Sequence, residues 1–188
     1  MSITPQSIYS EYTKKILNKI SASDSLIFLI ENSKSEQIRL ESIYFLKEIG
    51  LKNRYIFTFL ENLLISDLNE PIRRAAFDVI IKLFNQEIKA SSNIVKYVLK
   101  NENGQLLINL IEFLSKVDKS ACKKILINKI KSFQNQNFTD SSDNEILEKL
   151  SFNTLKNIAF NYIFKKSLEP FFFRNPKSPF AIDYFNVE

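Results

Sequence analysis

Histidine is absent from the chain, and cysteine occurs once, at Cys122. Without histidine, the protein has no imidazole base, which excludes the Ser-His-Asp and Cys-His catalytic arrangements and the commonest metal ligand. A single cysteine forms neither an intramolecular disulfide nor a thiolate zinc cluster. The sequence also carries no phosphate-binding loop and no paired-carboxylate motif. We therefore predict no catalytic residue, no metal and no cofactor.

Cys122 is the one nucleophile that needs a separate decision. It opens an expected helix beside Lys123 and Lys124, where neighbouring positive charge would lower the pKa of its thiol and make it reactive. The alternative is a buried cysteine with no chemical role, and this is the one that we favour.

Glycine is almost as scarce, with two residues against 188 in total, and there are five prolines. A chain so poor in turn-forming residues, with 45% hydrophobic content, favours an all-α protein with one substantial core. The longest strongly apolar run, Leu26–Ile30, is far shorter than the roughly 20 residues that cross a bilayer. The N-terminus has no apolar signal segment either. We expect a soluble cytoplasmic protein with no membrane span.

Charge of one sign does not dominate, because 26 basic and 21 acidic residues give a net charge of +5 and are interleaved along the chain. Binding to a nucleic-acid backbone depends on clustered cations, so this arrangement makes a nucleic-acid partner unlikely.

What the sequence does contain is a repeat. The segments Glu36–Ile49, Glu70–Leu83 and Gly104–Val117 each begin 34 residues after the one before. Their apolar residues align in four columns at helical spacing. The columns are Ile38, Ile72, Leu106; Ile43, Phe77, Ile111; Leu46, Ile80, Leu114; and Ile49, Leu83, Val117.

The segments that precede them keep the same offset. Their columns are Leu26, Leu60, Ile94; Leu29, Leu63, Tyr97; and Ile30, Leu64, Val98. Each unit is therefore predicted to be two helices joined by a short polar turn. Neither helix can bury its apolar side alone, so the spacing predicts that neighbouring units stack.

The residues around Pro71 narrow the kind of repeat. The run from Pro71 to Ala76 contains an isoleucine followed by arginine and then two alanines, and Ile38-Arg39 with Ser42 follows the same pattern. This resembles the second helix of HEAT-type repeats. The third unit departs from the pattern, since Leu107 stands where the arginines do. The resemblance implies a short right-handed α-solenoid of about four stacked helical hairpins plus caps, and it covers roughly residues 22–135.

In this resemblance Arg39 and Arg73 are structural ladder residues that pair with acidic or polar groups of a turn, such as Asp67. Pro71 fits the first turn of a helix, where its missing N–H costs nothing. Gly50 is expected to end a helix in the left-handed conformation.

The ends of the chain differ from the repeats. We predict a capping helix within residues 1–21, running from Ser7 to Ile20, and a loop with C-terminal capping helices over 136–166. The aromatic, proline-containing tail, 167–188, is not expected to continue as helix. Its rings, among them Phe171, Phe172 and Phe173, either fold over the last helices or anchor a partner.

HEAT-like proteins generally bind their partners along a ridge that their second helices form. Its candidate partner-binding residues here are Tyr44, Asp78, Glu112, Lys82 and Lys116. Because they mix both charge signs and include one aromatic ring, the alternative that they form an ordinary solvated face stays open. The sequence thus favours a non-catalytic scaffold or adaptor that binds another protein. Two alternatives stay open: a chaperone-like or lyase subunit resembling the HEAT-type bilin lyases, and a binder of nucleic-acid backbones.

Overall fold

The computed structural model describes residues 3–88, 92–102, 104–133 and 146–174, with the side chains omitted for 165–174. Throughout these residues the regular structure is helical, and they contain no strand. The chain divides into two compact units, Met1–Tyr97 and Val98–Glu188, called unit 1 and unit 2 below. No helix in the described ranges is both long and apolar enough to cross a bilayer.

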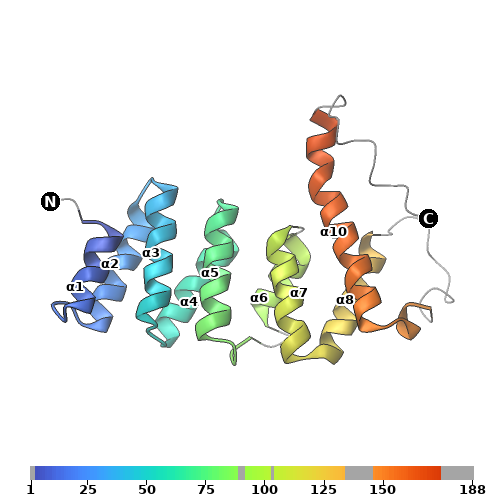
Figure 1. The fold of residues 1–188 in the computed structure, drawn as a ribbon, viewed down its shortest axis with the longest axis horizontal. Helices are drawn as coiled ribbons and strands as arrows, with labels where there is room; N and C mark the ends of the chain where they lie inside the picture. The colour runs from blue at the N-terminus through green and yellow to red at the C-terminus, as the bar shows by residue number, and fades with distance from the viewer. Residues whose placement is uncertain (1–2, 89–91, 103, 134–145, 175–188) are drawn as a thin grey trace. The chain divides into compact units, whose positions relative to one another are not determined.

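Unit 1 is built from helices that pack against their neighbours along the chain (Figure 1). Its helices are α1 (Pro5–Thr13), α2 (Lys19–Asn32), α3 (Glu36–Ile49), α4 (Arg54–Ser66) and α5 (Glu70–Leu83). α2 packs on α3 and α4 packs on α5, which makes two helical hairpins. α3 also packs on α5, so the second helices of consecutive hairpins lie side by side.

In unit 2, α7 (Gln105–Val117) packs on α8 (Lys119–Phe133), which in turn packs on α10 (Phe152–Arg174). α6 (Asn93–Asn101) contains the boundary between the two units. The 34-residue offset is visible in the helix ends, because α3, α5 and α7 end at Ile49, Leu83 and Val117.

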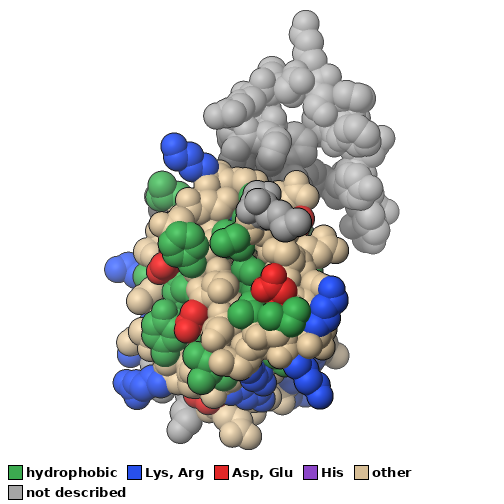
Figure 2. Space-filling model, turned by 90° about the vertical axis from the view of Figure 1, so that its left-hand side faces the viewer, with side chains coloured by type: hydrophobic (Ala, Val, Ile, Leu, Met, Phe, Trp, Pro, Cys, Tyr) green, Lys and Arg blue, Asp and Glu red, His purple; other side chains and the backbone are tan. Residues whose placement is uncertain are grey.

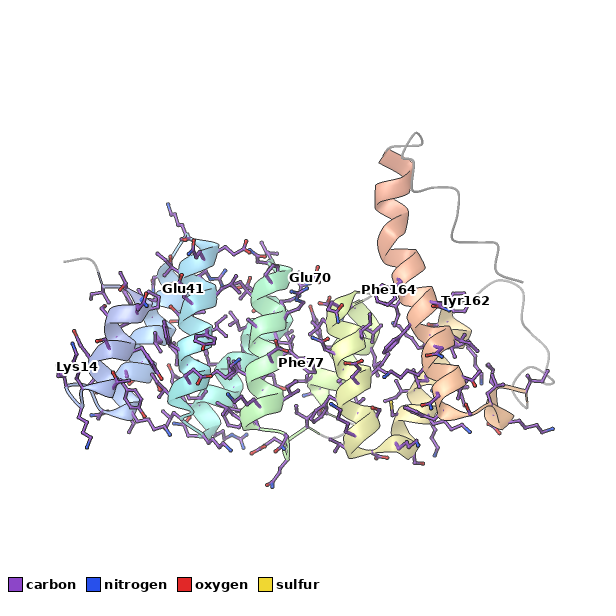
Figure 3. All side chains as sticks on the ribbon, in the orientation of Figure 1. Lys14, Glu41, Glu70, Phe77, Tyr162 and Phe164 are labelled. Atoms are coloured by element: carbon purple, nitrogen blue, oxygen red, sulfur yellow. The ribbon has the colours of Figure 1, made fainter. Side chains whose placement is uncertain are left out.

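The aligned apolar columns form much of the buried interior, as predicted. Leu46 and Ile80, for example, are fully buried, and so is Phe77, which Figure 3 labels on α5. Leu29, Ile38 and Tyr97 are half-buried. Val117 is the exception, since it is exposed at the last position of α7.

Short polar side chains mark where these helices begin. Ser35 and Asn53 accept hydrogen bonds from the backbone N–H groups of Ile38 and Ile56, which would otherwise lack partners. Gly50 follows α3 with φ 64°, a left-handed conformation that suits glycine, so the predicted helix stop is confirmed.

The helix predicted from Ser7 to Ile20 is wrong in its extent, because α1 ends at Thr13 and α2 begins at Lys19. Asn18 is the physical reason: its side chain accepts a hydrogen bond from Ser21 N–H at 2.9 Å and starts a new helix. Lys15, with φ 61°, turns the chain between the two. The end of unit 1 that carries α1 and α2 presents several hydrophobic side chains, as Figure 2 shows.

One prediction near the C-terminus also needs correction. In the region where a loop and capping helices are predicted, the described residues are helical on both sides of Leu150–Ser151, and Ser151 accepts from Thr154 N–H at 3.1 Å and caps α10. α10 then runs past the predicted boundary at 167 to Arg174, through Pro170. A proline removes one backbone hydrogen bond without preventing helical turns on both sides of it.

Candidate functional site

Arg39 connects the first hairpin of unit 1 to the loop inside the second. Its Nε donates to the carbonyl oxygen of Ile30 at 2.8 Å, and its Nη1 donates to Asp67 Oδ1 at 3.4 Å. Its Nη2 forms an ion pair with Asp67 Oδ2. Both side chains are largely buried, with exposed fractions of 20% and 10%. The guanidinium thus satisfies a carbonyl at the end of α2 and a carboxylate 28 residues further on.

Arg73 reaches the same loop in a different way. Its Nη1 donates to the backbone carbonyl oxygens of Asp67 and Leu68, at 3.0 and 3.3 Å. Asp67 Oδ1 in turn accepts from Asn69 N–H at 2.9 Å. The loop between α4 and α5 therefore receives two guanidinium groups, one on a carboxylate and one on carbonyl oxygens.

This arrangement refines the expected roles of Arg39, Arg73 and Asp67. The sequence placed each arginine against the turn before its own helix. Arg73 contacts that turn, whereas the carboxylate that pairs with Arg39 belongs to the following hairpin. Leu107, which occupies the position aligned with Arg39 and Arg73 in the third unit, is fully buried in unit 2.

The outer faces of α3 and α5 hold three of the predicted partner-binding residues, Tyr44, Asp78 and Lys82, and all three are exposed. Lys82 Nζ lies 3.3 Å from Glu48 Oε1, so this ion pair joins the two helices. Lys47 Nζ lies 5.3 Å from the centre of the Tyr44 ring, which is within cation–π range. These residues, Tyr44, Lys47, Glu48, Asp78 and Lys82, are called the α3–α5 ridge below.

An aromatic cluster supports the α3 side of the ridge. The Tyr44 ring meets the Phe45 ring edge to face, with 5.4 Å between their centres. Phe45 stacks on Tyr9 of α1 at 4.7 Å. Tyr44 is therefore held by packing and keeps about half of its surface exposed.

Asp78 lies between neighbouring positive charges on the ridge. Partial burial raises the pKa of its carboxyl group, and the positive charges of Lys47 and Arg74 act in the opposite direction. Glu41, which Figure 3 labels, lies on the neighbouring turn of α3 and accepts a hydrogen bond from Gln37 at 3.0 Å. The ridge thus combines one exposed ring with charges of both signs.

Glu112 and Lys116, the remaining ridge candidates, lie on α7 in unit 2, and both are exposed. Glu112 Oε1 lies 3.6 Å from Lys156 Nζ of α10. Phe171, Phe172 and Phe173 fall on the last turn of α10, and their side chains lie outside the described residues. So does the rest of the predicted tail, 175–188.

Cys122 is a buried cysteine, which is the alternative that the sequence favoured. It is fully buried in unit 2, with its Sγ 3.6 Å from the carbonyl oxygen of Ile111. Burial raises the pKa of its thiol to about 11, against a smaller lowering by Lys156 and a further raising by Asp118. The thiol is therefore protonated at neutral pH, and the predicted effect of neighbouring lysines on its reactivity does not arise.

One feature of unit 1 was missed by the sequence. An open pocket of about 380 Å³ lies between the start of α4 and the segment after α5. The rings of Phe57 and Phe84, 5.4 Å apart, form its apolar part. Charged residues of both signs surround them: Lys52, Arg54, Glu61 and Glu87. Phe57 and Phe84 stand 27 positions apart, outside the 34-residue period, so no repeat signal marked them.

The described residues contain no group of three or more metal-ligating side chains close enough to hold an ion. Comparison of the chain with protein-family models, with curated proteins and with solved structures finds no match in any of the three.

Proposed function

We propose that the protein is a non-catalytic scaffold that binds another protein, and that its helical hairpins are HEAT-like units of a short right-handed α-solenoid. The observation that carries the proposal is the α3–α5 ridge. Two second helices, one repeat apart, lie side by side and present an exposed tyrosine between charged residues.

The chemistry of the ridge suits a protein partner. Exposed tyrosine rings with neighbouring charges are typical of binding hot spots, because a ring contributes a large contact area at low conformational cost. Tyr44 is already fixed by Phe45 and Lys47, so little freedom is lost on binding. Asp78 and Lys82 supply charges of opposite sign on the adjacent helix.

The support beneath the ridge suits the same role. The buried columns and the two guanidinium groups on the Asp67 loop fix α3 relative to α5. A rigid pair of helices can hold side chains in a fixed pattern, as recognition requires. The ridge is thus supported from below by packing that needs no ligand.

The experiment uses the full chain, biotinylated and incubated with an extract of the source cells, followed by quantitative mass spectrometry. Tyr44→Ala is compared with Tyr55→Ala, because the two tyrosines have similar exposed fractions, 53% and 58%, and Tyr55 lies on α4. We expect specific partners to be reduced at least tenfold by Tyr44→Ala and to be unchanged by Tyr55→Ala. If both variants retain the partners equally, or if none is retained by the wild type, the ridge is not the binding surface.

A further inference from the structure

The end of unit 1 that carries α1 and α2 is unusually apolar for the end of a helical-repeat array. Such arrays remain soluble when their terminal helices turn a polar face outward. Here Ile16, Ile20 and Phe28 are 68%, 60% and 62% exposed. Figure 2 looks onto this end and shows hydrophobic side chains across it, with acidic ones among them.

Helix α2 places these side chains in a regular row. Ile20, Asp24 and Phe28 are four residues apart and therefore share one face of the helix, which Glu31 extends. All four are exposed, whereas Leu26 and Ile30 on the other side are fully buried. The row, Ile20, Asp24, Phe28 and Glu31, is called the α2 outer face below. Its apolar members are additional to those that the core of unit 1 uses.

The charges at the two ends of α2 have opposite signs. Lys14 and Lys15 lie in the turn before the helix, and Lys19 is its first residue. Glu31 lies in its last turn. Figure 3 labels Lys14 at the end of α1 that leads into this turn, and Figure 2 shows Lys and Arg side chains gathered toward the lower edge of the same end.

A surface that is apolar in the middle, basic at one end and acidic at the other is complementary to itself. If two copies meet with their α2 helices antiparallel, Ile20 faces Phe28 of the partner subunit, and the basic end of each helix lies beside Glu31 of the partner subunit. The helix dipoles are also opposed in this arrangement, which is favourable. A two-fold axis through such a pair passes near Asp24 and makes the contact closed.

We propose that the α2 outer face is a self-association surface, through which two copies of this chain pair with their α2 helices antiparallel. The site is separate from the α3–α5 ridge and does not depend on the function proposed for it. A standard interface buries about 800 Å² on each partner. Because the apolar row is short, we expect dissociation constants on the order of ten micromolar.

Sedimentation equilibrium of the full chain over a range of concentrations tests the proposal. We expect the wild type to shift from monomer to dimer, and Phe28→Asp to weaken the dimer at least tenfold. Tyr55→Asp is the matched control, since it exchanges an equally exposed ring on α4 and leaves association unchanged. A wild type that stays monomeric up to about one hundred micromolar overturns the proposal, as does equal weakening by both variants.

Charge exchange identifies the antiparallel geometry. Lys19→Glu and Glu31→Lys should each weaken the dimer severalfold, and the double variant should restore it, because the pair across the axis is re-formed with its signs reversed. Both changes also suit the helix dipole, so neither should unfold α2. Asp24→Asn should tighten the dimer, since it removes two like charges beside the axis. A double variant weaker than either single one would contradict the arrangement.

Tyr44→Ala should leave self-association unchanged. This outcome separates the two surfaces, because loss of the partner on the ridge and loss of the dimer on the α2 outer face then follow from different substitutions.

Discussion

The second helices of unit 1 and α7 of unit 2 share their apolar columns but differ at the position that Arg39 and Arg73 occupy. Arg39 and Arg73 are polar there and bind the Asp67 loop, whereas Leu107 is fully buried. The positions aligned with Asp67 are Ser33 and Asn101, so the carboxylate occurs in one of the three repeats. The 34-residue period therefore rests on apolar burial, and among the described residues the arginine–aspartate contacts belong to unit 1.

A substitution in the shared apolar columns should have the largest effect on the stability of the fold. Ile80→Asp places a charge at a fully buried position of α5, and we expect it to lower the free energy of unfolding by about 4 kcal/mol or more. Circular dichroism during thermal unfolding measures this. Lys82→Gln, on the same helix but exposed, is the control and should melt close to the wild type, because it removes only a surface ion pair. A melt of Ile80→Asp that matches wild type would contradict the register of the repeat.

Removing the arginine–aspartate contact of unit 1 should lower the free energy of unfolding by a smaller amount. Asp67→Ala leaves the guanidinium of Arg39 without its carboxylate, and we expect a loss of about 2 kcal/mol, because both side chains are mostly buried. The contact from Arg73 to the backbone carbonyl oxygen of residue 67 is retained.

Arg39→Leu in the Asp67→Ala background gives α3 the residue that α7 carries. It removes the unpaired charge, so urea unfolding should show part of the lost stability restored. A double variant less stable than Asp67→Ala would mean that Arg39 acts mainly through the carbonyl oxygen of Ile30.

In unit 2, the buried thiol of Cys122 makes the stability of the fold depend on pH. Its thiol pKa is raised in the folded chain, from an ordinary 9.0 to about 11, so as pH rises the unfolded chain loses its thiol proton first. The stabilisation from this group is therefore complete below pH 9.0 and is lost as pH rises toward about 11. We expect a loss on the order of 1 kcal/mol between pH 9 and 10.5.

Urea unfolding of the wild type and of Cys122→Ala at both pH values isolates this contribution from the other groups that titrate there. An identical change in the two proteins would show that the thiol does not contribute.

The smallest effect is expected for the ion pair on the ridge. Lys82 and Glu48 are both substantially exposed, so Lys82→Ala should change stability by less than about 0.5 kcal/mol. A double-mutant cycle with Glu48→Ala in thermal unfolding measures the coupling. A coupling above about 1 kcal/mol would mean that the pair stabilises the contact between α3 and α5 as strongly as a buried one.

The sequence predicted what depends on local pattern. Apolar spacing identified the helices around Phe77 and Ile111, and Gly50 identified the end of α3, because each signal lies within the element that it describes. The division of the N-terminal helix was missed because apolar spacing continues through Ile16 and Ile20, while the cap at Asn18 competes with it.

Contacts between hairpins were harder to predict than helices. The choice of Arg39 for a carboxylate in the following hairpin depends on how α3 packs on α5, and no spacing within one repeat encodes it. The pocket between Phe57 and Phe84 depends on the same packing. The exposure of Ile20 and Phe28 could not be predicted from the sequence either, because the spacing of apolar residues along a helix is the same whether or not another helix covers them.

Asp67, in the loop between α4 and α5, is contacted by two arginine side chains that come from different helices, Arg39 of α3 and Arg73 of α5. A shift of this turn would displace the groups that Arg39 of α3 and Arg73 of α5 both contact. A substitution in this turn should therefore change the packing of α3 on α5 even though it leaves both helices themselves unaltered.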